Sequence, residues 1–189
     1  MRTFAFVTVD VFTDTRFGGN PLAVFPDARG MSDDEMQALA AELNLSETTF
    51  VLPPADPAHT ARVRIFNRTA EMPFAGHPTL GSCHAWLEAG GAPKDKDLIV
   101  QECAVGLVSI RRAGQHLAFA APPLTRSTPA PELLAQVAQA LGIQAQQILA
   151  AQVLVNGPSW LGLLLDSVDT VSYTHLRAHE TVLDLVCRL

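Results

Sequence analysis

Glu47 is the side chain of this 189-residue chain with the clearest potential for acid–base chemistry. It lies in NLSETTFV, between a helical pattern and a strand-like run. A carboxylate flanked by apolar residues at the mouth of a strand can be partly desolvated, a setting in which it can take and return a proton. The alternative is a solvated carboxylate at a helix-to-strand corner, because most glutamates are exposed.

Gly76 and His77 begin an apolar helical pattern in PFAGHPTLGSCHAWLEAGG, where Pro78 is typical of a first helical turn. The N–H groups of that turn and the positive end of the helix dipole favour an anion, and Gly76 permits its close approach. His77 would add a donor beside the anion, for which a substrate carboxylate is the expected candidate. A capping or packing role for His77 stays open.

Asn20, in FGGNPLAVF, is the third candidate. Turn chemistry alone would explain an asparagine there, and the alternative is a hydrogen-bonding side chain held at a rigid loop tip. His77, Cys83 and His84 lack a third ligand at a usual spacing, so no metal site is expected. The sequence contains neither a glycine-rich phosphate loop nor a nucleophile elbow.

Composition narrows the class of protein. Hydrophobic residues make up 48% of the chain and charged residues 17%, enough for one full domain with a sizeable core. The net charge of −6 argues against a nucleic-acid partner. No apolar run is long enough to span a bilayer, and the start of the chain is too polar for a signal peptide. A cytoplasmic location without a membrane partner is the expectation.

The positions of the apolar residues predict an α+β fold. Helices are expected at 31–46, with a capping box from Ser32 to Glu35, at 76–89 and at 131–143. Strands are expected at 4–12, 22–26, 47–54, 61–67, 98–101, 107–111, 117–120 and 159–167. The helix after Gly76 is apolar nearly all round, which is typical of a helix enclosed by other elements. We therefore expect a curved mixed sheet wrapped around one central apolar helix.

Three motifs together resemble the PhzF-like isomerase family of phenazine biosynthesis: DVFTDTRFGGNPLAVF, ELNLSETTFV and EMPFAGHPTLG. The resemblance covers roughly residues 1–171 and implies a diaminopimelate-epimerase-like fold, in which two similar lobes enclose a cleft. It implies that Glu47 is the acid/base, that Asn20, Gly76 and His77 line the substrate site, and that no cofactor or metal is used. Related epimerases have a cysteine where this chain has Ala75, so a two-thiol mechanism is not expected.

The resemblance also predicts the domain organisation. Residues 1–122 would form the first lobe, 123–171 a linker helix and the first strand of an incomplete second lobe, and 172–189 a non-native tail. The tail resembles translated sequencing-adapter DNA, and the alternative is an ordinary amphipathic helix. Family members are longer, with an Asp and a DPATGSA motif that this chain lacks, so the chain alone is expected to be inactive. The resemblance allows a homodimer for a full-length form.

Together these observations predict a cofactor-independent isomerase or epimerase that moves a proton on a small carboxylate-bearing metabolite, with Glu47 as general acid/base. The competing hypothesis is a non-catalytic ligand-binding or interaction domain with the same fold. Glu47 favours the enzyme, because a binding domain needs no acid at that position. The sequence does not specify the metabolite.

Overall fold

The computed structural model describes residues 2–114 and 116–178, and the chain divides into two compact units. The first unit comprises Met1–Pro123 with Asn156–Pro158, and the second comprises Leu124–Val155 with Ser159–Leu189. The first unit contains all four candidate site residues.

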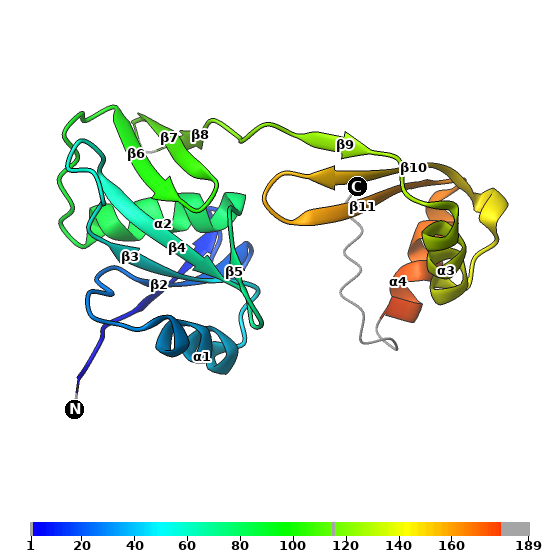
Figure 1. Ribbon diagram of the computed structural model, residues 1–189, viewed down its shortest axis with the longest axis horizontal. Coiled ribbons are helices and arrows are strands. Elements are labelled where there is room, and N and C mark those ends of the chain that lie inside the picture. The colour runs from blue at the N-terminus through cyan, green and yellow to red at the C-terminus, as the bar shows by residue number, and fades with distance from the viewer. Residues whose placement is uncertain (1, 115, 179–189) are drawn as a thin grey trace. The chain divides into compact units, whose positions relative to one another are not determined.

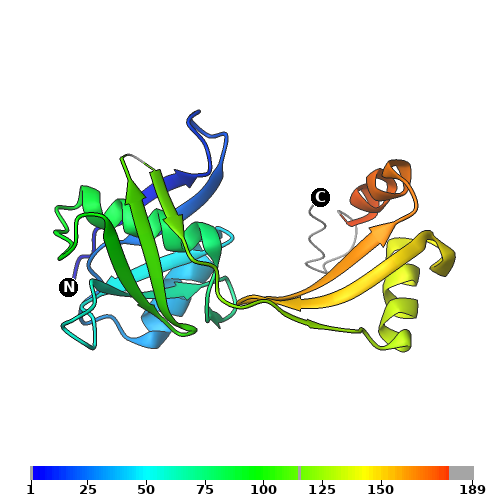
Figure 2. The same ribbon diagram turned by 90° about the horizontal axis from the view of Figure 1, so that it is seen from above.

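The first unit is a mixed sheet that curls around helix α2 (Gly76–Glu88) (Figure 1; Figure 2). In spatial order its strands are β1 (Val7–Val11), β2 (Asn20–Phe25), β3 (Thr48–Leu52), β4 (Ala61–Phe66), β6 (Leu98–Cys103), β7 (Gly106–Ala113) and β8 (His116–Phe119), with β5 (Glu71–Met72) paired to β4. The β2–β3 and β4–β6 pairs are parallel and the others are antiparallel. The predicted α+β class, with a curved mixed sheet around a helix, is confirmed.

Helix α2 is enclosed by the sheet, as its all-round apolar pattern predicts. Its buried residues are His77, Pro78, Thr79, Gly81, Ser82, Cys83 and Ala85. At Gly81 the helix lies so close to β2 that an added Cβ would be 2.6 Å from Leu22 Cδ2. There is therefore no room for even a methyl group between α2 and β2 at this point.

Helix α1 (Asp33–Leu43) packs on the other face of the same sheet. Its predicted capping box is confirmed: the Ser32 hydroxyl accepts from the Glu35 N–H at 3.2 Å, and the Glu35 carboxylate accepts from the Ser32 N–H at 2.8 Å. Beneath it, the rings of Phe25 and Phe50 stack with their centroids 4.9 Å apart, and Phe66 meets Phe50 edge-on at 5.5 Å. Strands β2, β3 and β4 are thus covered on both faces, by α2 on one and by α1 on the other.

The first hairpin differs from its sequence pattern. The strand predicted at 4–12 occupies only Val7–Val11, and it ends there because Phe12 turns the chain with a φ of 65°. Asn20, predicted in a turn, is the first residue of β2 and pairs with Val11. Asn20 is therefore held by the ladder and not by a free loop.

The second unit contains a three-stranded sheet in the order β11 (Ser159–Leu165), β10 (Ile148–Val155), β9 (Thr125–Ser127). A core of Val137, Ala138, Leu141, Ile143 and Leu165 joins this sheet to α3 (Pro131–Leu141). The sequence pattern predicts one strand in this region and the structure has three. Strand β10 has the sequence ILAAQVLV, a mostly apolar run without strict alternation, and periodicity alone does not distinguish such a run from a helical segment.

The predicted tail begins inside a helix. Helix α4 runs from Val168 to Ala178, across the expected boundary at Ser172. Thr174 is buried in it, and its hydroxyl donates to the Val171 carbonyl at 2.7 Å. Residues 179–189, which include Cys187, lie outside the described residues. The non-native origin of the tail stays a prediction.

Glu102, near the end of β6, holds the loop between β3 and β4. Its carboxylate accepts from the N–H groups of Ala55 and Asp56 at 2.8 and 2.9 Å, and it lies 2.7 Å from His59 Nδ1. Burial alone would raise the pKa of Glu102, but these hydrogen bonds together hold it at about 2, against an ordinary value of 4.5. Glu102 is therefore an ionised anchor for the loop.

Glu102→Gln should lower the free energy of unfolding at pH 7 by on the order of 2 kcal/mol. Each pKa unit corresponds to about 1.4 kcal/mol, and partial exposure of Glu102 and His59 to solvent reduces the total. The folded pKa lies below the unfolded one, so this stabilisation is present above about pH 4.5 and is lost as the pH falls towards about 2. Urea unfolding of both proteins across this range measures it. A stability difference that stays constant with pH would contradict the assignment.

Candidate active site

Asn20, Glu47 and His77 meet inside the first unit although they are far apart in the sequence. Asn20 Nδ2 lies 3.1 Å from His77 Nδ1, and His77 Nε2 lies 3.4 Å from Glu47 Oε2. Only 8% of the His77 side chain and 17% of the Glu47 side chain are exposed. The imidazole therefore bridges an amide and a carboxylate in a largely buried cluster.

The topology of the sheet accounts for this meeting. Strands β2 and β3 are parallel neighbours with Ala23 opposite Thr48, so Asn20 and Glu47 lie at the same edge of the sheet. Helix α2 packs on both strands and begins at that edge with Gly76 and His77. Parallel pairing places the amino ends of two strands side by side, and the close contact at Gly81 fixes the helix against them.

Ser46 is a fourth polar residue of the cluster, and its sequence context does not distinguish it from other serines. Its hydroxyl donates to Asn20 Oδ1 at 3.4 Å. The available signal was its position directly before Glu47, but a serine there is equally typical of a turn.

The hydrogen bonds at Asn20 assign a tautomer to His77. With Asn20 Oδ1 accepting from Ser46, the Nδ2 amide group is the one that faces the imidazole. An amide nitrogen only donates, so His77 Nδ1 is the acceptor and Nε2 carries the proton. Nε2 lies 3.4 Å from Glu47 Oε2, which is within ion-pair distance but does not form a hydrogen bond in this structure. The tautomer is thus inferred from the contacts among Ser46, Asn20 and His77, which determine where the ring proton lies.

Gly76 is the first residue of α2, and Ala75 precedes it without a side-chain cap. The Thr79 N–H bonds to the Ala75 carbonyl at 3.2 Å, and Pro78 has no N–H. The N–H groups of Gly76 and His77 are therefore the first-turn donors that the helix itself does not use. A Cβ at Gly76 would lie 3.1 Å from Phe119 Cζ, so a side chain there would crowd β8.

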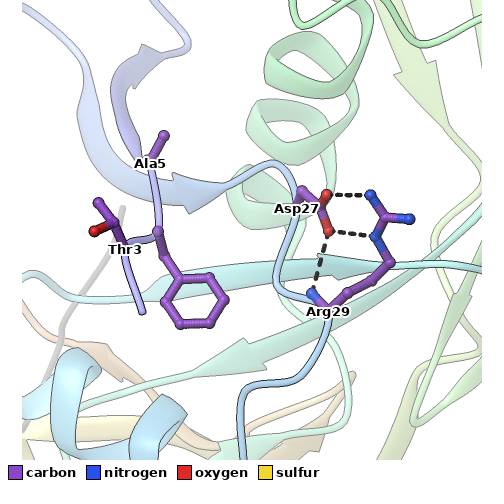
Figure 3. A pocket seen from close by; sticks show the side chains of 5 residues that line it. Thr3, Ala5, Asp27 and Arg29 are labelled. Carbon is purple, nitrogen blue, oxygen red and sulfur yellow. Dashed lines mark hydrogen bonds and ion pairs between the residues drawn. The ribbon is translucent and has the colours of Figure 1, made fainter. Parts of the chain in front are cut away.

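An open pocket of about 360 Å³ lies elsewhere on the first unit, between the N-terminal segment and the end of β2 (Figure 3). It is lined by Thr3, Phe4, Ala5, Asp27 and Arg29, and by none of the four candidate residues. The Arg29 guanidinium already donates two bonds to the Asp27 carboxylate, and these bonds lower the pKa of Asp27 to about 2. The charges of this pocket thus neutralise each other.

The described thiols are poor nucleophiles. Burial raises the pKa of Cys83 to about 12 and that of Cys103 to about 11, so neither ionises readily near neutral pH. Within residues 2–114 and 116–178, no three His, Cys, Asp or Glu side chains are grouped as metal ligands. No helix in the same residues is both long and apolar enough to cross a membrane.

Comparison with known proteins adds a family and a fold. Residues 9–189 match the family described as phenazine biosynthesis-like protein (PhzC-PhzF). Antisense-enhancing sequence 1 of Schizosaccharomyces pombe is 37% identical over 179 residues, and trans-2,3-dihydro-3-hydroxyanthranilate isomerase of Pseudomonas aeruginosa is 37% identical over 173 residues. Each match covers 90% of this chain and 60% of the relative, so the chain spans about 60% of the length of these relatives.

The solved structure of a predicted epimerase from Pseudomonas aeruginosa superposes with a TM-score of 0.76 at 29% identity. That match covers 90% of this chain and 62% of the epimerase. It agrees with the diaminopimelate-epimerase-like fold that the three motifs imply.

Proposed function

The chain belongs to the phenazine biosynthesis-like protein family, and on this premise we propose that Glu47 is the general acid/base of an isomerase that moves a proton on a small carboxylate-bearing metabolite. One observation carries the proposal: a largely buried carboxylate lies 3.4 Å from one ring nitrogen of a histidine whose other ring nitrogen contacts an amide. A proton-transfer group must be held in one orientation beside its substrate, and this cluster supplies such an orientation.

The proposed roles follow from the donors and acceptors of each group. Glu47 takes the proton from one carbon of the substrate and returns it to another position. His77 Nε2–H orients the carboxylate between these steps, and Asn20 maintains the tautomer that makes this possible. The proposed reaction needs only a carboxylate to carry the proton.

The substrate class is proposed from the start of α2 and from a relative. The N–H groups of Gly76 and His77, at the positive end of the helix dipole, suit a carboxylate. The Pseudomonas aeruginosa relative is named for a dihydro, hydroxylated derivative of anthranilate, which is a ring with a carboxylate. We propose a small acid of this kind as substrate, for a protein that has the family's whole length.

Binding of anthranilate to this chain tests the carboxylate site without requiring turnover. Adding anthranilate should shift the amide NMR signals of Gly76 and His77 in a saturable way, because the anion binds their N–H groups. Anthranilamide, which has the same ring without the negative charge, is the matched control and should leave both signals in place. Equal shifts with the two compounds, or none with either, would contradict a carboxylate site at the start of α2.

A further inference from the structure

Two hydroxyl groups in the interior of the first unit connect the three elements that carry the cluster. Ser82 on α2 donates to Thr49 Oγ1 on β3 at 2.7 Å, and Thr49 in turn is 3.5 Å from the Ala23 carbonyl on β2. Ser82, Thr49 and Ala23 are all fully buried. The result is a short polar chain from helix to strand to strand in an otherwise apolar core.

Each of these three residues lies close in sequence to one member of the cluster. Ser82 is little more than one helical turn beyond His77, Thr49 is two residues beyond Glu47, and Ala23 follows Asn20 on the same strand. Residues two apart in an extended segment point to the same side, so Thr49 and Glu47 both face α2. A displacement of the hydroxyl pair would therefore displace Glu47 against His77.

We infer that Thr49 and Ser82 are positioning residues that set the separation of Glu47 and His77. This inference rests on the proposed function of that pair. A buried hydrogen bond is directional, so it restricts the relative position of the two elements more narrowly than the apolar contacts around α2 do. Catalytic groups must be held closely, because a displacement of about 1 Å can reduce a rate about 10²-fold.

The alternative is that the two hydroxyl groups only provide hydrogen-bond partners for each other. Two buried hydroxyls that bond to each other can often be replaced by apolar groups of the same shape at little cost in stability. Stability alone therefore does not explain why a polar pair occurs here. Its position between the elements that carry the cluster offers an explanation. The two explanations differ in what happens to His77 when the pair is removed.

Thr48 offers a control in the same strand. It is also buried, with 1% of its surface exposed, but its hydroxyl has no hydrogen-bond partner among the described residues. Thr48→Val and Thr49→Val thus make the same chemical change at adjacent buried positions, and only the second removes a bond to α2. Thr49→Ser keeps the hydroxyl and removes the methyl group.

The test is the tautomer of His77, measured in this 189-residue chain from the ring ¹⁵N signals in long-range NMR spectra. We expect one dominant Nε2–H form in the unmodified chain, in Thr48→Val and in Thr49→Ser. Thr49→Val and Ser82→Ala should lose that dominance and give a mixture of tautomers, since the imidazole is no longer held between Asn20 and Glu47. Dispersed amide spectra verify that each variant is folded.

Ser82→Ala decides the question if Thr49→Val does not fold, because it removes a single oxygen and alanine is favoured in helices. A dominant Nε2–H form in folded Ser82→Ala would overturn the inference, as would a Thr48→Val variant that changes as much as Thr49→Val. An unmodified chain without a dominant Nε2–H form would overturn it too. None of these outcomes depends on turnover, so they are distinct from a failure of the proposed isomerase activity.

Discussion

Replacing Glu47 with glutamine should slow exchange of the substrate's transferred proton with solvent by about 10²–10⁴-fold, the usual contribution of a general acid/base. Glutamine keeps the shape of the side chain and an oxygen that can accept a hydrogen bond near His77 Nε2, which lies 3.4 Å from the carboxylate. It cannot take up and release a proton. The substitution therefore separates proton transfer from the packing of the cluster.

Solvent deuterium incorporation, followed by NMR in a protein with the family's whole length, measures this effect. Glu42→Gln is the matched control, because it makes the same change at an exposed carboxylate on α1 and should leave exchange unaltered. Substrate binding should be largely retained in Glu47→Gln. Exchange in Glu47→Gln as fast as in Glu42→Gln would remove Glu47 from the proposed role.

Much of the first unit follows from local sequence patterns. The capping box of Ser32 and Glu35 needs only two residues of one turn, and the enclosed α2 needs only its own apolar surface. Glu47, His77 and Asn20 could be named because their motifs occur in a specific order along the chain. These features depend on residues that are near one another in sequence, or on a family pattern that already contains the fold.

What could not be predicted depends on partners distant in the sequence. The bond between Thr49 and Ser82 joins residues 33 positions apart, and periodicity indicates the face on which each lies but not the atom that it meets. The contact of Asn20 with His77 spans 57 positions and arises from the packing of α2 on β2. Ser46 is of the same kind, since nothing in its own segment distinguishes a serine that orients Asn20 from one that ends a helix.

Gly19→Ala should lower the free energy of unfolding more than a methyl group added at the neighbouring Gly18. A Cβ at Gly19 would lie 2.3 Å from the Val11 carbonyl oxygen and 2.7 Å from Thr13 Cγ2, both far inside contact distance. Val11 pairs with Asn20 in the β1–β2 ladder, so the backbone cannot move away without disturbing Asn20. We expect a loss of about 3 kcal/mol in the free energy of unfolding, the upper part of the range for overpacked sites.

The same substitution should disturb the cluster as well as the fold, because Gly19 directly precedes Asn20. Its N–H donates to Asp10 Oδ2 at 3.2 Å, and an added methyl group would press against that carboxylate too. Once Asn20 is displaced, His77 Nδ1 loses this donor, and we expect the Nε2–H form to lose its dominance. Urea unfolding and the ring ¹⁵N signals of His77 measure the two effects in the same sample.

Gly18→Ala distinguishes a local effect on Asn20 from a general effect on the hairpin. Its Cβ would meet the Thr13 hydroxyl at 3.0 Å and the Thr15 carbonyl at 3.2 Å, contacts that are tight but that the exposed loop can relieve. We expect a smaller loss of stability and an unchanged His77 tautomer in this variant. If Gly19→Ala lowered stability but left the His77 tautomer unchanged, the position of Asn20 would depend on β3 and α2 and not on Gly19. The tight turn before it would then serve the hairpin and not the cluster.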